Sequence, residues 1–304
     1  MPVIVLEPRD LFSSLSLARM CAILFGCLTF SLVASMEESK LSPLHQMLSF
    51  RILCMFTWCL FFALTLLIHV VNVIQFHSLV PISWKNLTVS VAALAALMTL
   101  SATLSFPWAV AGHGSVQPCA VAATVSSCLT FAAYVAEAYL IRTQAQDERG
   151  YMASVPGLLK VLQLWGGCEM VVLVVEQVQS YLREPVEDTT AMLWVSGTIY
   201  VVCLLMSLAT VVVVLGDCAG RCPVPFDRLL VCFSLTGVLF YMVATILCFA
   251  RVLGGRQQGK SPTEEMKMTW AVVVMETVVA SITLLAYTVD LAFSFKLLRD
   301  RSQA

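Results

Sequence analysis

Residues 158–179 read LLKVLQLWGGCEMVVLVVEQVQ, a stretch that is apolar almost throughout. Its length matches the roughly 20 residues that a helix needs to cross the hydrocarbon core of a bilayer. One cation, Lys160, stands near its start, and two acids, Glu169 and Glu176, stand inside it. The stretch therefore predicts a transmembrane helix that carries charged groups into the membrane.

The composition of the whole chain agrees with this interpretation. Of its 304 residues, 59% are hydrophobic and only 12% are charged, and the mean hydropathy is +0.87. Soluble domains carry roughly 25% charged residues. The balance indicates a polytopic membrane protein, and a net charge of −1 gives no basis for expecting a nucleic-acid partner.

Eight segments are long and apolar enough to span a bilayer. They are Leu15–Ser35, Arg51–Gln75, Leu87–Trp108, Cys119–Ile141, Leu158–Gln179, Ala191–Leu215, Arg228–Ala250 and Met268–Phe295. Helices are the expected form, because a helix satisfies its own backbone groups inside lipid. The alternating pattern of a barrel strand is absent from the sequence. The fold class predicted is therefore all-α.

The start of the fifth segment repeats the start of the first. Arg19 is followed seven residues later by Gly26-Cys27, and Lys160 is followed seven residues later by Gly167-Cys168. The two patterns lie 141 residues apart. A repeat of this length is much longer than one helix and predicts a duplicated unit of several helices.

A second pattern marks the end of each unit. The fourth segment closes with Tyr134 and Glu137, and the last segment closes with Tyr287 and Asp290, 153 residues later. The order cation, Gly-Cys and Tyr-x-x-acid therefore occurs twice. We expect two four-helix units, with about a dozen additional residues before the last helix.

The predicted units cover residues 14–150 and residues 155–301. The polar segment Arg142–Gly157, RTQAQDERGYMASVPG, joins them. Because each unit has an even number of spans, both units should have the same orientation. They would be parallel repeats, related by an axis along the membrane normal.

The distribution of lysine and arginine predicts the orientation in the membrane. If the N-terminus lies inside, eleven of these residues fall on the cytoplasmic side and seven on the outer side. Four of the seven belong to one segment, Arg251–Lys267, which is expected to be an outer loop. The count favours a cytoplasmic location for both termini.

Three acids are predicted to lie inside the membrane: Glu169, Glu176 and Glu276. An ionised acid at the centre of a span costs roughly 2.5–3.5 kcal/mol on insertion scales, so each needs a partner, a proton or water. One interpretation is a transporter or channel that uses these acids. The other is a structural role, in which carboxyl groups hold helices together. Leu28 occupies the place of Glu169 in the first repeat, so this acid is not part of the duplicated pattern.

The duplicated charges are Arg19 and Glu137 in the first unit and Lys160 and Asp290 in the second. Each cation begins a helix on the expected cytoplasmic side, and each acid lies near the cytoplasmic end of the fourth helix of its unit. At a shared depth they could form two structural ion pairs. The alternative is that each cation extends to the headgroups independently.

No enzyme motif is present, and neither a cofactor nor a metal site is expected. The sequence has no phosphate-binding loop, no G-x-S-x-G and no H-E-x-x-H. No Cys-x-x-Cys pair or Cys/His cluster has the spacing of metal ligands. The chain is predicted not to be an enzyme.

Two positions are candidates for covalent modification. Cys218 and Cys222 lie in a predicted cytoplasmic loop next to a span, where cysteines can be palmitoylated, although unmodified thiols are the alternative. Asn86-Leu-Thr88 has the form of a glycosylation sequon. It would lie on the cytoplasmic side, so we expect it to be unmodified.

Two four-helix units, each opening with a cation before Gly-Cys and closing with Tyr-x-x-acid, resemble tandem MARVEL domains. With eight spans and both ends inside, the chain resembles the myeloid-associated differentiation marker family and its marker-like relatives over almost its full length. The resemblance implies a role in membrane organisation, vesicle trafficking or contact with the cell cortex. It also implies that the partners are the lipid bilayer, including cholesterol-rich domains, and membrane or cortical proteins. MARVEL domains have no known catalytic residues that could be transferred to this chain.

Overall fold

The computed structural model describes residues 12–36, 48–75, 82–107, 118–143, 150–183, 190–216, 226–257 and 264–303. Within these ranges the protein is all-α, and eight helices have the length and composition of membrane spans. The chain divides into two compact units, residues 1–158 (unit 1) and residues 159–304 (unit 2). The division falls at the end of the predicted joint, in the first turn of a helix.

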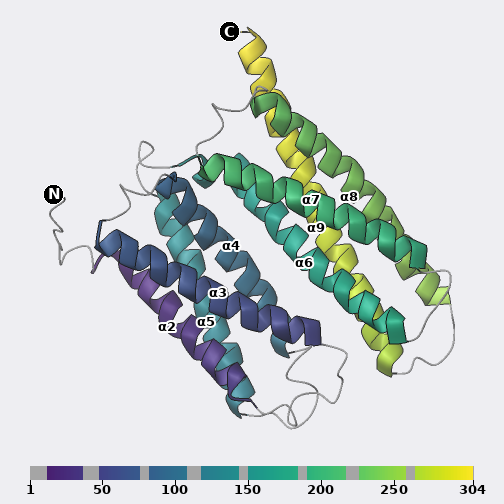
Figure 1. Ribbon diagram of the computed structural model, residues 1–304, viewed down its shortest axis with the longest axis horizontal. Helices are drawn as coiled ribbons and strands as arrows, with labels where there is room; N and C mark the ends of the chain where they lie inside the picture. Colours follow the sequence, from purple (N-terminus) through teal and green to yellow (C-terminus); the bar gives the residue numbers. More distant parts are fainter. Residues whose placement is uncertain are drawn as a thin grey trace. The chain divides into compact units, whose positions relative to one another are not determined.

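Unit 1 is a bundle of four helices (Figure 1). They are α2 (Ser14–Ala34), α3 (Leu48–Val73), α4 (Trp84–Ser105) and α5 (Pro118–Thr143). Helix α2 packs against α3 and α5, and α4 packs against the same two helices, so the four form a closed ring. The side of α4 that faces this ring carries small residues, including Ala92, Ala95 and Ala102, which are almost fully buried. Small side chains let helices approach closely inside a membrane, where lipid competes for every apolar contact.

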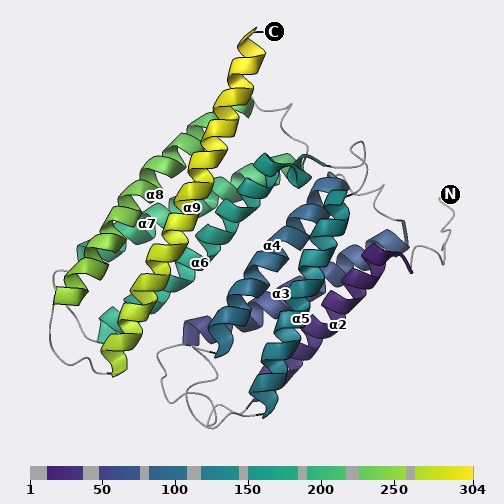
Figure 2. The same ribbon diagram turned by 180° about the vertical axis from the view of Figure 1, so that it is seen from behind.

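Unit 2 also contains four long helices (Figure 2). They are α6 (Val155–Arg183), α7 (Thr190–Leu215), α8 (Phe226–Gln257) and α9 (Glu264–Gln303). Helix α8 packs against α7 and α9. Glycine makes the close contact between α6 and α7, because a Cβ on Gly167 would lie 3.1 Å from the Cβ of Leu204. In unit 1, a Cβ on Gly26 would lie 3.2 Å from the Cβ of Phe62, at the corresponding place.

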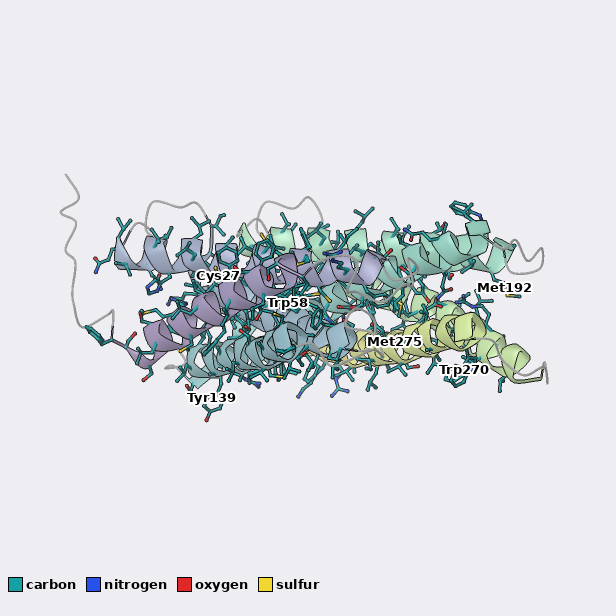
Figure 3. The ribbon with its side chains drawn as sticks, turned by 90° about the horizontal axis from the view of Figure 1, so that it is seen from below. Cys27, Trp58, Tyr139, Met192, Trp270 and Met275 are labelled. Carbon is teal, nitrogen blue, oxygen red and sulfur yellow. The ribbon has the colours of Figure 1, made fainter. Side chains whose placement is uncertain are left out.

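The outer surface of each unit is apolar, as lipid contact requires. Leu24, Leu104 and Leu205 are all more than half exposed. The side chains of Tyr139 and Trp270 also lie on the outer surface of their helices (Figure 3). These exposed side chains indicate faces that contact lipid rather than water.

The last two helices extend beyond their predicted spans. Helix α8 continues to Gln257, and α9 contains 40 residues, from Glu264 to Gln303. Hydropathy detects only the part of a helix that lies in lipid. Acids near the start of α9, at Glu264, and cations near its end, at Lys296, suit the helix dipole and favour a helix outside the apolar segment.

A short 3₁₀ helix, η6 (Tyr151–Ala153), forms the end of the joint within unit 1. Asn86 at the start of α4 holds it. The Asn86 side chain accepts a hydrogen bond from the backbone N–H of Met152 at 3.0 Å and donates one to Ser83 Oγ at 2.9 Å. The side chain of the sequon asparagine is therefore buried and engaged on both sides.

Candidate functional site: buried ion pairs of the two units

In unit 1, Arg19 and Glu137 meet inside the bundle. Ser13 caps the start of α2 by accepting a hydrogen bond from the backbone N–H of Ser16, which places Arg19 in the second turn. Arg19 Nε donates to Glu137 Oε1 at 2.6 Å, and both side chains are only 3% exposed. The pair therefore joins the first helix of the unit to its fourth.

In unit 2, Lys160 and Asp290 meet in the corresponding place. Lys160 Nζ lies 2.5 Å from Asp290 Oδ2. Two neutral side chains complete this site: Ser234 on α8 donates to the same oxygen at 2.5 Å, and Gln163 on α6 donates to it at 3.0 Å. Lys160 also donates to Ser234 Oγ at 3.3 Å. The structure thus brings together both cation–acid combinations that the repeat singles out.

The two ion pairs differ in their neutral partners. The residue 141 positions before Gln163 is Ala22, and the residue 142 positions before Ser234 is Ala92. Both alanines are buried in unit 1 and offer no polar side chain. The ion pair of unit 1 therefore lacks the hydrogen bonds that surround the ion pair of unit 2.

The repeated tyrosines make matching hydrogen bonds. Thr65 on α3 donates to Tyr134 Oη at 3.1 Å, and Ser207 on α7 is hydrogen-bonded to Tyr287 Oη at 2.7 Å. Thr65 and Ser207 lie 142 residues apart. Each unit thus places a tyrosine hydroxyl in contact with its second helix, one turn before the paired acid.

A third ion pair lies in unit 2 and was not predicted from the sequence. Arg251 Nη2 donates to Glu276 Oε2 at 2.6 Å, and the Glu276 side chain is 0% exposed. Gln177 Nε2 donates to Glu276 Oε2 at 2.7 Å, and Tyr200 Oη donates to Glu276 Oε1 at 3.0 Å. Arg251 Nη1 also donates to Gln177 Oε1 at 2.6 Å. The four helices of unit 2 all contribute to this cluster.

The prediction that a loop begins at Arg251 is wrong. Arg251 belongs to α8, which continues to Gln257, and its side chain lies three residues along the helix from that of Cys248. The signal that could have revealed it is the helical spacing of Tyr241, Cys248 and Arg251, which puts these side chains on one face. Apolar content alone ended the span too early.

The other two intramembrane acids also lie inside unit 2. Glu169 and Glu176 are both buried, on α6. Neither faces lipid. Of the three acids considered for transport, Glu276 has its charge balanced by Arg251. Such balance is the usual state of a structural buried charge.

Cys218 and Cys222 lie outside the described residues. Within the described ranges, His, Cys, Asp and Glu side chains form no group of three or more that could hold a metal ion. The described polar clusters are therefore ion pairs with neutral hydrogen-bond partners.

Comparisons with known proteins place these features in a family. No protein-family model matches the sequence, and no solved structure matches it significantly. The chain is 32% identical over 311 residues to a myeloid-associated differentiation marker homolog from Xenopus laevis, which covers 97% of this chain and 96% of that protein.

Two mammalian relatives agree. The human myeloid-associated differentiation marker is 31% identical over 306 residues, covering 96% of this chain and 91% of that protein. The mouse myeloid-associated differentiation marker-like protein 2 is 30% identical over 297 residues, covering 93% of this chain and 91% of that protein. The similarity extends through both units, and the chain belongs to the myeloid-associated differentiation marker family.

Proposed function

We propose that this protein is a non-enzymatic membrane organiser, which arranges membrane domains, supports vesicle trafficking or links the membrane to the cell cortex. The observation that carries this proposal is the distribution of polar groups. Intramembrane charges are paired inside each unit, and the outer surfaces are apolar. Such units present lipid-facing surfaces for assembly and hold their own polar groups in structural contacts.

The family membership supports the same role. The relatives are named as differentiation markers, and these names describe no reaction. The transporter or channel interpretation receives no comparable support. In unit 2 the Glu276 carboxylate is bonded to Arg251, Gln177 and Tyr200, so a carried ion or proton would have to displace those partners.

The proposed location is the plasma membrane or an endomembrane, with both termini in the cytoplasm. The excess of lysine and arginine on that side supports this orientation. The partners proposed are lipids, including those of cholesterol-rich domains, and membrane or cortical proteins that contact the cytoplasmic ends. Each unit would act as a MARVEL-like bundle.

Proximity labelling from the C-terminus tests the function. A biotin ligase fused after Ala304 should label trafficking or cortical proteins above the level reached by an unrelated eight-span protein in the same membrane. If the two labelled sets are the same, the protein has no selective neighbours and the proposal fails.

Lipidation of Cys218 or Cys222 would favour partitioning into ordered lipid. One acyl chain adds little anchoring to a protein that eight helices already hold. Hydroxylamine-sensitive incorporation of a palmitate analogue should fall in the Cys218→Ala/Cys222→Ala variant. Equal incorporation in the variant and the parent would remove this site from the proposal.

A further inference from the structure

Arg19 has hydrogen-bond donors that the described part of unit 1 does not use. Its Nε donates to Glu137, but neither of its two terminal nitrogens has a hydrogen-bond partner among the described residues. The side chain is nevertheless 3% exposed. A buried guanidinium normally uses most of its five donors, and unused donors are costly. Two donor groups at this place therefore indicate that a further acceptor belongs there.

The comparison with unit 2 explains why the donors are unused. There, Ser234 and Gln163 supply neutral partners to the Lys160–Asp290 pair. Ala92 and Ala22 occupy the matching places in unit 1. The same bundle position is therefore polar and filled in unit 2, and polar but incomplete in unit 1.

Further polar groups accompany Arg19. Ser16 lies one turn earlier on the same face of α2, and its buried Oγ has no hydrogen-bond partner in the described structure. Helical side chains lean toward the N-terminus, so the stem of Arg19 leans toward Ser16. On α3, His69 lies close enough to experience the charge of Arg19. The matching residues in the second repeat are Gly157 and Val211, which carry no polar side chain.

The surrounding charge is positive. Lys85 in the first turn of α4 and Arg142 in the last turn of α5 are exposed, and both helix ends lie beside the N-terminus of α2 (Figure 1). Among the described residues at this end, Glu137 is the single acid against Arg19, Lys85 and Arg142. The amino end of α2 adds the positive end of a helix dipole.

We propose that this end of unit 1 binds the phosphate group of an anionic phospholipid, with the terminal nitrogens of Arg19 as its main ligands. The guanidinium presents paired donors that match phosphate oxygens, while Nε remains on Glu137. Ser16 is positioned to donate to the same group, and Lys85 and Arg142 favour an anionic headgroup at the rim. Basic pockets between membrane helices bind lipid headgroups in this way. The proposal does not depend on the membrane-organising role, because a protein without that role would still bind the lipid.

Native mass spectrometry of the full-length protein in mild detergent tests the site. Phosphatidylserine and phosphatidylcholine with identical acyl chains are titrated separately. We expect the parent protein to bind phosphatidylserine about tenfold more tightly, as charge-assisted hydrogen bonds would provide. The Arg19→Gln/Glu137→Gln variant replaces the ion pair with a neutral, similarly shaped pair and should lose this preference.

Two further variants keep the result interpretable. Lys160→Gln/Asp290→Asn makes the matched change in unit 2 and should retain the preference for phosphatidylserine. Ala92→Ser introduces the hydroxyl of unit 2 beside Arg19 with a minimal change of volume, and should reduce the preference several-fold. All variants are compared at equal elution volume in size-exclusion chromatography.

The outcomes separate clearly. A preference that survives in both Arg19→Gln/Glu137→Gln and Ala92→Ser overturns the proposal, as does an equal loss in the unit 1 and unit 2 double variants. A parallel titration with inorganic phosphate distinguishes the source of the phosphate group. Binding of inorganic phosphate that requires Arg19, without any preference between the two lipids, would assign the site to a soluble phosphate and overturn the lipid assignment.

Discussion

At the scale of single residues, the structure is organised by buried charges that meet across long sequence separations. A buried ion pair adds little net stability over a well-packed apolar pair, because both charges must leave water. Removing one partner is much more damaging, because the other charge stays buried and uncompensated. The three ion pairs therefore act as conditions for correct assembly of each bundle.

The Arg19–Glu137 pair gives a direct test. Glu137→Gln should destabilise unit 1 by roughly 3–5 kcal/mol, because it leaves the Arg19 charge uncompensated. Reduced surface expression and a lower thermal unfolding temperature are the measurements. The exchange Arg19→Glu with Glu137→Arg should restore part of the loss. Arg142→Gln, which changes an exposed charge on the same helix, serves as the control and should have little effect. Normal expression of Glu137→Gln would show that the pairing does not contribute to folding.

The Arg251–Glu276 pair predicts a rescue. Arg251→Met should destabilise unit 2 by roughly 3–5 kcal/mol, because the fully buried Glu276 carboxylate loses its counter-charge. Adding Glu276→Gln should recover most of this stability, since Gln177 and Tyr200 can still bond to an amide. Thermal unfolding in detergent measures both variants. A double variant that is less stable than the single variant would contradict the structural role of this pair.

At the scale of elements, α8 shows how one helix face serves several contacts. Ser234, Tyr241, Cys248 and Arg251 recur at helical spacing and face the interior, whereas Leu239 and Ile246 face outward. The polar stripe reaches from the Lys160–Asp290 pair to the Arg251–Glu276 pair. Tyr241 links the two ends by packing on Tyr200 and Tyr287, with ring centroids 5.7 Å and 5.4 Å away.

Gly237 on α8 permits the approach of Tyr287. A Cβ at this position would lie 2.8 Å from Tyr287 Cζ, so Gly237→Ala should displace the ring and disturb its hydrogen bond to Ser207. Overpacking of this kind costs about 1–3 kcal/mol. Gly197→Ala is the control, because its Cβ would meet only Val174 Cγ1 at 3.3 Å. Equal unfolding temperatures for the two variants would refute the close contact at Gly237.

At the scale of the whole molecule, the two units are built on one pattern and completed differently. Both place a cation of the first helix against an acid of the fourth and a tyrosine hydroxyl against the second. Unit 2 adds neutral hydrogen bonds and a third ion pair. Unit 1 has alanines at two of those places. Duplication thus preserved the bundle, while the polar interiors diverged.

The orientation of the chain is a prediction at this scale. With both termini in the cytoplasm, epitope tags added before Met1 and after Ala304 should be detected only after the cells are permeabilised. The reason is the excess of cations on that side, which resist transfer across the membrane. Detection of either tag on intact cells would overturn the orientation and, with it, the expectation of cortical partners.

The sequence by itself determined the eight spans, because crossing a bilayer depends on local apolar length. Seven span boundaries lay close to the helices found, but the span that ended at Ala250 left Arg251 outside a helix that reaches Gln257. Hydropathy fails there because a helix can carry a charge inward when a partner awaits it. The duplicated positions also pointed to Arg19 with Glu137 and Lys160 with Asp290, because repetition suggests a shared role.

Only the tertiary structure decided which polar groups complete each site. Arg19 and Glu137 are 118 residues apart in sequence, and Lys160 and Asp290 are 130 apart, so their contact depends on helix packing. The Gln177, Arg251 and Glu276 cluster has no counterpart in the repeat and no local pattern that announces it. Ala22 and Ala92 appear as ordinary core residues in the sequence. Their significance arises only when the bundle places them where the other unit has a hydrogen-bond partner, because packing selects neighbours that sequence spacing does not specify.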